Sequence, residues 1–338
     1  MATIKDVAAL AGISYTTVSH VLNKTRPVSE PVRLKVEAAI AELDYVPSAV
    51  ARSLKARSTA TIGLLVPNSV NPYFAELARG IEDACERNGY CVILCNSDDN
   101  PQKQRSYLSV LLEKRVDGLV VASVGEERDL LDSLASVRTP MVIVDRALDG
   151  VDADLVRVDH EQGAYLATRH LLDLGHVDIA CINGPANTSV AKLRLAGFRR
   201  ALREAGVGLR DGRVLDGDFT SLGGYEAAAQ LLSRDRPTAI FAANDLMGIG
   251  VLRAAAERSI SVPGELSVIG FDDIQMCPYV YPALTTVGQS IRELGEMAAA
   301  ILLRRIVGSG SAALEQRIIA PKIVLRESTG PSPDLFSG

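Results

Sequence analysis

The first part of the chain carries apolar side chains at helical spacing, in three short groups. The groups are Ile4, Val7, Ala8 and Ala11, then Val18, Val21 and Leu22, then Val32, Val36, Ile40 and Leu43. Each group would form one buried stripe along a helix of about 3.6 residues per turn. Gly12 allows a tight corner between the first two helices, and the Ser14 hydroxyl can accept from a free amide at the start of the second. Residues 1–47 therefore predict a three-helix head.

From Thr61 onward the pattern changes to short apolar runs that alternate with longer amphipathic stretches. The runs are 61–66, 91–95, 118–122, 141–144, 178–182, 239–242 and 266–270, and helical stretches lie at 72–88, 102–115, 162–174, 193–205, 222–232 and 246–258. Runs with little polar alternation are typical of parallel strands buried on both faces. We therefore expect an α/β fold with two doubly wound parallel-sheet subdomains, joined near Asp159–Gln162. In such sheets ligands bind beyond the carboxyl ends of the strands.

Charge is distributed unevenly along the 338 residues, although the net charge is only −5. Residues 1–60 hold eight Lys and Arg against five Asp and Glu, a net of +3, which leaves −8 for the rest. A basic head on an acidic body is the distribution expected when only the head meets phosphates. No apolar run is long enough to span a membrane, and the first twenty residues lack a signal-peptide core, so we expect a cytoplasmic protein without a membrane partner.

The sequence gives no support to catalysis or to a cofactor. The five cysteines are scattered without a CxxC pair, and the four histidines have no metal-like grouping. Gly248-Ile249-Gly250 lacks the third glycine of a dinucleotide fingerprint and falls inside an expected helix. Asp272 and Asp273 are adjacent after an expected strand, where side chains tend to point apart rather than form a catalytic pair. We expect no enzyme activity, no metal and no cofactor.

A polar face on the second helix is the first candidate for a binding surface. If the apolar stripe of this helix faces inward, the opposite face carries Tyr15, Thr16, Ser19 and His20. This face offers hydrogen-bond donors and acceptors and an aromatic ring, and it has no carboxylate. A helix-turn-helix presents such a face to the major groove of DNA. The alternative is a small helical hairpin whose polar face is only solvated.

Polar residues recur directly after the expected strands of the body. They are Asn71 with Tyr73 and Phe74, Asp145 with Arg146, Arg194, Asp218 with Phe219, Asn244 with Asp245, and Asp272 with Asp273. Such a set suits a neutral polyhydroxylated ligand, because each hydroxyl can donate to a carboxylate and accept from a guanidinium, while rings cover the apolar faces of a sugar. Singly, Asp and Asn after a strand are turn formers or helix caps. Their recurrence after one strand after another favours a ligand site.

Several motifs together resemble the lactose/galactose repressor family of bacterial transcription regulators. In order they are TIKDVAALAGISYTTVSHVLN, YVPSAVARSLK, KRVDGLVV, RLAGFRRAL, AANDLMGIGVL, SVIGFDD and PALTTV, and they extend the resemblance from Met1 to about Ser328. Within the family the chain is similar to the ribose and purine repressors, notably in TVSHVLNKTR, PSAVARSLK and GDF. The resemblance implies a helix-turn-helix head, a hinge helix and a core like that of periplasmic sugar-binding proteins.

The resemblance also implies roles for individual residues. Those implied to contact DNA are Thr3, Ser14, Tyr15, Thr16, Thr17, Ser19, His20 and Asn23 in the head, and Arg52, Leu54 and Lys55 in the hinge helix. Leu54 would wedge into the central minor-groove step, where contacts to the kinked DNA offset the unstacking. Those implied to contact the ligand are Asn71, Tyr73, Phe74, Asp145, Arg146, Arg194, Phe219, Asn244, Asp272 and Gln289.

Arg146 bears on the identity of the ligand. The similar ribose and purine repressors carry a tryptophan at this position. An arginine fits a sugar better than a flat purine, which needs a stacking ring. We expect ribose or another pentose first, another sugar second and a purine third.

The expected organisation has four parts. They are the head at 1–47, the hinge helix and linker at 48–60, an N-terminal subdomain at 61–159 plus 291–319, and a C-terminal subdomain at 160–290 plus 320–338. These parts predict a homodimeric repressor that binds a palindromic operator and responds to a small sugar. A purine-responsive repressor of the same family is one alternative, and a sugar-binding protein without a regulatory role is another.

Overall fold

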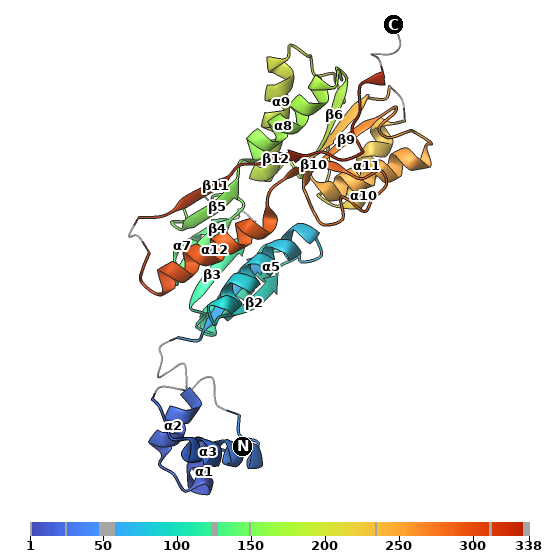
Figure 1. Ribbon diagram of the computed structural model, residues 1–338. Coiled ribbons are helices and arrows are strands. Elements are labelled where there is room, and N and C mark those ends of the chain that lie inside the picture. The colour runs from blue at the N-terminus through green and yellow to red at the C-terminus, as the bar shows by residue number, and fades with distance from the viewer. Residues whose placement is uncertain are drawn as a thin grey trace. The chain divides into compact units, whose positions relative to one another are not determined.

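The structure, a computed structural model, describes residues 2–23, 26–46, 58–122, 128–148, 150–233, 235–310 and 313–333. The chain divides into two compact units, Met1–Ala60 and Thr61–Gly338. Figure 1 shows the helices and strands of both units. Arg52, Leu54 and Lys55 of the expected hinge helix lie outside the described residues.

The described part of the first unit contains three helices, as the apolar spacing predicts. They are α1 (Ile4–Ala11), α2 (Tyr15–Asn23) and α3 (Glu30–Glu42). Their small core contains the buried residues Val7, Ala8, Val18, Val36 and Ala39. Gly12 ends α1 with a φ of 63°, a left-handed conformation that costs glycine little. The Ser14 hydroxyl accepts from the Thr17 amide at 3.2 Å at the start of α2, so the predicted corner and cap are both confirmed.

The described residues of the second unit form two six-stranded sheets, with the strand orders β11-β5-β4-β3-β1-β2 and β12-β10-β9-β8-β6-β7. The first sheet contains β1 (Thr61–Val66), β2 (Cys91–Asn96), β3 (Gly118–Ala122), β4 (Met141–Val144), β5 (Asp154–Val158) and β11 (Gln316–Ile319). The second contains β6 (Ile179–Asn183), β7 (Val214–Asp216), β8 (Ala239–Ala242), β9 (Ser267–Asp272), β10 (Thr285–Gly288) and β12 (Lys322–Val324). Neighbouring strands are parallel, except that β12 is antiparallel to β10. The expected class, a pair of doubly wound parallel sheets, is confirmed.

Helices cover the faces of both sheets (Figure 1). The first sheet is flanked by α5 (Pro72–Arg87), α6 (Pro101–Glu113), α7 (Arg128–Ala135) and α12 (Ile291–Ile306), and the second by α8 (His160–Asp173), α9 (Ser189–Glu204), α10 (Ser221–Leu231) and α11 (Asp245–Glu257).

Glycine allows close packing of α5 on α12, because a Cβ on Gly80 would lie 2.3 Å from the Arg292 carbonyl oxygen. Gly250 packs in the same way, since its Cβ would lie 2.2 Å from the Ser221 carbonyl oxygen. The GIG sequence in α11 is therefore a packing feature.

Within the described residues the chain passes between the two sheets three times. It leaves the first sheet after β5 and enters α8 at His160. It returns after β10 through α12, which packs on β3, β4 and β5, and it crosses again between β11 and β12. Each subdomain therefore contains segments that are distant in the sequence.

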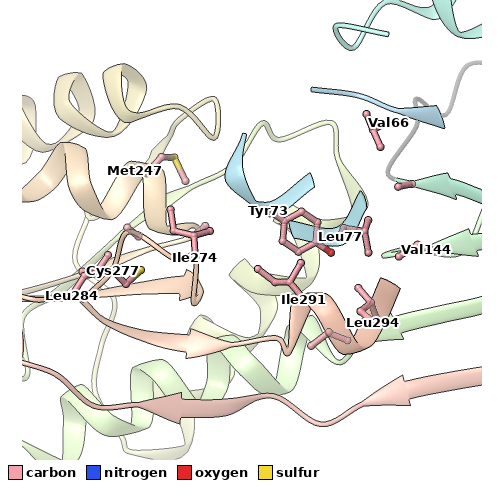
Figure 2. Packing of buried hydrophobic residues seen from close by; sticks show 14 of the residues in the cluster. Val66, Tyr73, Leu77, Val144, Met247, Ile274, Cys277, Leu284, Ile291 and Leu294 are labelled. Atoms are coloured by element: carbon pink, nitrogen blue, oxygen red, sulfur yellow. The ribbon is translucent and has the colours of Figure 1, made fainter. Parts of the chain in front are cut away.

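The apolar core is continuous between the two subdomains. Figure 2 shows one cluster that contains Tyr73, Leu77, Ile291 and Leu294 of the first subdomain and Met247, Ile274, Cys277 and Leu284 of the second. All of these side chains are buried. Because buried side chains in such a core hold defined rotamers, the cluster fixes the position of the Tyr73 ring.

Candidate functional site

A cavity of about 480 Å³ lies where the carboxyl ends of strands from both sheets meet, the edge at which parallel sheets bind ligands. Nine of the ten residues expected to contact a ligand line it, namely Asn71, Tyr73, Phe74, Asp145, Arg146, Arg194, Phe219, Asn244 and Asp272. The tenth, Gln289, is fully buried and reaches the cavity only through Asp272, to which its Nε2 donates. The volume is in the range of sites for small molecules.

Asn71 and Asn244 cap helices as well as lining the cavity. The Asn71 side chain accepts from the Tyr73 amide at 3.0 Å at the start of α5. Asn244 accepts from the Met247 amide at 3.0 Å at the start of α11, and its Nδ2 donates to the Phe219 carbonyl oxygen at 3.0 Å. The capping interpretation is therefore correct for both residues. It is compatible with a ligand site, because helix N-termini point free amides at the same cavity.

Asp145, Phe219 and Asp272 hold backbone conformations that favour glycine. Their φ angles are 83°, 64° and 128°. Such conformations cost a non-glycine residue about 1–3 kcal/mol and concentrate at functional sites. Each of the three residues ends or follows a strand, and each lines the cavity. Positive φ also occurs away from the cavity, for instance at Asp98 and Ser259, so it is compatible with a binding role without deciding against turn formation.

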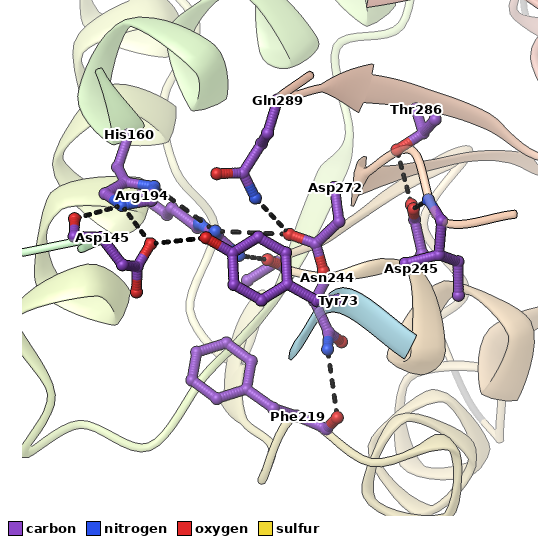
Figure 3. A network of polar contacts seen from close by, with 12 residues as sticks. Tyr73, Asp145, His160, Arg194, Phe219, Asn244, Asp245, Asp272, Thr286 and Gln289 are labelled. Carbon is purple, nitrogen blue, oxygen red and sulfur yellow. Dashed lines mark hydrogen bonds and ion pairs between the residues drawn. The ribbon is translucent and has the colours of Figure 1, made fainter. Parts of the chain in front are cut away.

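A chain of polar contacts joins the two subdomains at the cavity (Figure 3). In the first subdomain the Tyr73 hydroxyl donates to Asp145 Oδ1 at 3.2 Å. In the second, Asp272 Oδ1 accepts from Gln289 Nε2 at 2.5 Å and from Arg194 Nη2 at 3.4 Å. Each subdomain thus contributes one carboxylate whose orientation is set by hydrogen bonds.

Arg194 is fixed from several sides. Its Nη1 donates to the Ala243 carbonyl oxygen, and its guanidinium carbon lies 3.8 Å from the centroid of the Phe271 ring. Its Nη2 also lies 3.3 Å from His160 Nδ1, and His160 Nε2 lies 3.1 Å from Asp145 Oδ1. His160 is absent from the residues expected to form the site, yet it connects the two sides of the cavity.

Burial raises the pKa of the Asp272 carboxyl well above its ordinary value. The Arg194 guanidinium opposes this shift, whereas the Asp245 and Asp145 carboxylates add to it. Burial also raises the pKa of the Tyr73 hydroxyl, and the Asp145 carboxylate raises it further, so Tyr73 is a donor at neutral pH. A ligand that donates hydrogen bonds to these carboxylates would stabilise their charged forms.

Some buried polar atoms at or just behind the cavity have no hydrogen-bond partner among the described residues. They are Arg194 Nε at the cavity and Gln289 Oε1 behind Asp272. An unpaired buried polar atom costs about 1–3 kcal/mol, so each one calls for an explanation. Arg194 lines the cavity, so a ligand oxygen there could accept from its Nε.

Aromatic and aliphatic side chains form the other walls. Phe74 and Phe219 line the cavity together with Val190 and Leu246. The Phe219 ring packs on Gly184, where a Cβ would lie 2.0 Å from it. Rings of this kind cover the apolar face of a sugar or stack on a flat heterocycle. These walls restrict the size of a ligand without deciding its class.

The cavity also contains residues that were not expected to contact a ligand. They are Pro67, Asn68, Val70, Asp99, Pro185, Asn187, Thr188, Val190, Thr220 and Leu246, and Asp218, which the pattern after strands already pointed to, lines it as well. Asn68 and Asp99 follow β1 and β2 just as Asp145 follows β4, so the same pattern of a polar residue after a strand identifies them. Burial raises the pKa of the Asp99 carboxyl, and Arg146 opposes the shift. Asp99 is therefore a further carboxylate that a ligand could meet.

The candidate DNA-reading face of α2 is partly as expected. Tyr15 is 53% exposed, Thr16 is exposed and His20 is half-buried. Ser19 is only 7% exposed, so its expected place on the solvent face is wrong. A helix turns by about 100° per residue, which puts Ser19 at the edge of the apolar stripe rather than opposite it. There the Asn23 Nδ2 donates to the Ser19 hydroxyl at 3.2 Å.

Thr3, Ser14 and Thr17 make contacts at helix starts. The Thr3 amide and hydroxyl donate to Asp6 Oδ2 at 2.7 and 2.8 Å, and Ser14 Oγ lies 2.9 Å from Thr17 Oγ1. Side chains and amides at such positions can meet phosphates. Their contact with DNA stays a prediction.

Neither a metal cluster nor a membrane span occurs in the part of the chain that the structure describes. No group of three or more His, Cys, Asp or Glu side chains there could hold a metal ion. No helix in the same residues combines the length and apolar character needed to cross a bilayer.

Both units of the chain match known protein families. Residues 3–48 match bacterial regulatory proteins of the lacI family, and residues 59–328 match the family described as periplasmic binding proteins and sugar binding domain of the LacI family. The chain is 46% identical over 332 residues to the HTH-type transcriptional repressor PurR of Photobacterium profundum, covering 97% of this chain and 98% of that protein. It is 46% identical over 310 residues to the ribose operon repressor of Escherichia coli, covering 90% and 93%.

Solved structures give the same result. The lac repressor dimer bound to operator and the anti-inducer ONPF has a TM-score of 0.87 and 31% identity, covering 97% of this chain and 99% of that one. A LacI family transcriptional regulator from Enterococcus faecium with bound ribose has a TM-score of 0.72 and 36% identity, covering 80% and 99%.

Proposed function

The chain belongs to the LacI family of bacterial regulatory proteins and is a DNA-binding repressor of that family, and we propose that a small sugar, ribose or a related pentose, controls its affinity for a palindromic operator. The sugar binds between the two subdomains, and α2 reads the operator. The match of residues 3–48 to the regulatory family argues against the alternative of a sugar-binding protein without a regulatory role.

The arrangement of Asp145, Arg146, Arg194 and Asp272 around one cavity supports a sugar as effector. A sugar hydroxyl can donate to a carboxylate while it accepts from a guanidinium, so two carboxylates and two arginines can bind a ring of hydroxyls. The ribose bound in the Enterococcus faecium relative supports the choice of a pentose.

A purine is an alternative effector from another chemical class, because the PurR and ribose repressor relatives are equally similar to this chain. Phe74 and Phe219 line the cavity and could stack on a purine ring. Arg146 favours the sugar. It is only 8% exposed, and its charge gains more from hydroxyl acceptors than from the apolar face of a heterocycle.

Recognition of DNA is assigned to the exposed side of α2, where Tyr15, Thr16 and His20 can reach base edges in the major groove. A homodimer would bind the two halves of a palindromic site with one head each. The dimer of the lac repressor relative on its operator supports this arrangement. The minor-groove role of Leu54 stays a prediction from the resemblance.

Coupling between the two sites follows from the position of the cavity. A sugar that bonds to Asp145 on one subdomain and to Asp272 on the other favours one relative orientation of the subdomains. If that orientation changes operator affinity by some factor, operator binding must change sugar affinity by the same factor.

Calorimetry of the full-length protein with D-ribose, D-xylose and hypoxanthine tests the effector. We expect D-ribose to bind most tightly and, at saturation, to change the affinity for a duplex obtained by selection from random DNA. Arg146→Trp should strengthen hypoxanthine binding, because it supplies a stacking ring. Tighter binding of hypoxanthine than of either sugar to the parent protein would reject the sugar. Failure to select any symmetric duplex would reject the proposed operator binding.

A further inference from the structure

Building on the proposed effector function, we propose that His160 is a positioning residue that holds Asp145 of one subdomain and Arg194 of the other in the geometry that binds the effector. His160 is the first residue of α8, where the chain crosses from the first sheet to the second. It is 1% exposed and does not line the cavity, so it acts through the two residues that do.

The contacts of His160 determine which imidazole nitrogen carries the proton. Nε2 lies 3.1 Å from Asp145 Oδ1 and 3.2 Å from the Asp145 carbonyl oxygen, and both of these oxygens accept. Nδ1 lies 3.3 Å from Arg194 Nη2, which can only donate. The proton is therefore on Nε2, and Nδ1 is the acceptor. The opposite tautomer would place an N–H against the guanidinium and a lone pair against the carboxylate.

This tautomer connects the two carboxylates that face the effector. Asp145 accepts from His160, His160 accepts from Arg194, and Arg194 Nη2 donates in turn to Asp272 Oδ1. The Phe271 ring packs beneath the middle of this chain, with its centroid 6.0 Å from that of the imidazole. His160 and Arg194 both belong to the second subdomain, so a change in the relative position of the subdomains stretches the contact between His160 and Asp145. The imidazole keeps the hydrogen-bonding pattern of the cavity in one arrangement.

Substitutions at His160 separate a polar positioning role from packing. His160→Gln retains an N–H near Nε2, His160→Asn retains an acceptor near Nδ1, and His160→Phe retains a ring without either. We expect His160→Phe to weaken D-ribose binding about 10- to 100-fold in calorimetry, because two hydrogen bonds to charged groups are lost, and the other two variants to lose less. A ring that only packs would give the opposite order, with His160→Phe closest to the parent protein, and that result would overturn the proposal. If His160→Phe does not fold, less than about a twofold loss in both amide variants would overturn it.

His170 offers a matched control on the same helix. Its Nε2 lies 3.0 Å from Thr329 Oγ1, and it does not line the cavity. His170→Phe also removes a histidine contact from α8, and it should leave D-ribose affinity within about twofold. A loss equal to that of His160→Phe would assign the effect to general weakening of α8 and overturn the proposal.

A spectroscopic measurement tests the same geometry without an effector. In ¹⁵N NMR of histidine-labelled protein at neutral pH, the His160 signals, assigned by their loss in His160→Gln, should show a protonated Nε2 and an unprotonated Nδ1. A proton on Nδ1 would overturn the proposal. If D-ribose, D-xylose and hypoxanthine all fail to bind the parent protein, the proposed effector is wrong. The NMR measurement then still tests whether His160 donates to Asp145 and accepts from Arg194.

Discussion

Replacement of Asp272 by asparagine tests whether the effector donates a hydroxyl to this carboxylate. Oδ1 of Asp272 already accepts from Gln289 Nε2 at 2.5 Å and from Arg194 Nη2 at 3.4 Å. The amide oxygen of Asp272→Asn can take over both contacts, which puts the amide nitrogen in the place of Oδ2. The effector then meets a donor where the parent protein offers a charged acceptor.

The loss of a hydrogen bond to a charged group costs about 1.5–3 kcal/mol, which corresponds to about 10- to 150-fold weaker binding. Stability should not fall with it. Because burial raises the pKa of the Asp272 carboxyl, the folded protein disfavours its ionised form, and this cost grows as the pH rises above the ordinary pKa of 3.8. Asparagine has no charge to bury. Asp272→Asn should therefore unfold at an equal or higher temperature at pH 7, and its stability should decline less as the pH rises.

Calorimetry with D-ribose and thermal unfolding measure the two effects on the same protein. Asp273→Asn is the matched control, because Asp273 Oδ1 accepts from Arg326 Nη2 at 2.6 Å and the residue does not line the cavity. It should leave D-ribose affinity unchanged. Unchanged affinity in Asp272→Asn would refute a contact between Asp272 and the effector. Lost affinity together with a lower unfolding temperature would instead show that the carboxylate is structural.

Three further substitutions test other parts of the molecule. His20→Ala should change the preference at one base pair of a selected operator by about 1–3 kcal/mol in competition binding, whereas an equal loss for every sequence would indicate a phosphate contact. Ser14→Ala removes the cap of α2 and should destabilise the head by about 1 kcal/mol in thermal unfolding followed by circular dichroism; no change would contradict the capping role. Asp154→Ala removes the carboxylate that accepts from Arg305 Nε and Nη2 at 2.7 Å, and it should cost about 1.5–3 kcal/mol at pH 7. Burial raises the pKa of the Asp154 carboxyl, but hydrogen bonds from Arg305 and the Glu315 amide outweigh burial and lower the pKa below 3.8. The parent protein should therefore lose the stability of this ion pair as the pH falls below 3.8. A variant that is equally sensitive to acid would contradict the pairing.

The sheets can be predicted from the sequence where strands are apolar and buried. The apolar runs give β1, β3, β4 and β8 with their observed ends, and they give β2, β6 and β9 to within two residues. They do not predict β5, β7, β10, β11 or β12, which are short or carry polar residues such as Asp154 in β5 and Gln316 in β11. These strands form because a neighbouring strand supplies hydrogen-bond partners, and for β11 that neighbour, β5, is distant in the sequence.

Most of the cavity is also predictable, because polar residues after strands gather at one edge of a parallel sheet. His160 escapes this argument, since β5 before it carries Asp154 and does not look like a buried strand. The burial of Gln289 behind Asp272 depends on packing that no local pattern contains. The error at Ser19 has the same origin, because neighbouring helices decide how far around α2 the buried face extends.

Strain and unpaired groups at the cavity have one explanation if a ligand completes the site. The conformations of Asp145 and Asp272 cost about 1–3 kcal/mol each, and the unpaired Nε of Arg194 costs a similar amount. These costs fall on residues of both subdomains, so a ligand can offset them together only when the subdomains hold one relative orientation. A ligand that contacted a single subdomain would bind equally well in every orientation, and it would shift no equilibrium however tightly it bound. The division of the polar groups between the two subdomains is therefore the feature that would allow the proposed effector to control a separate DNA-binding head.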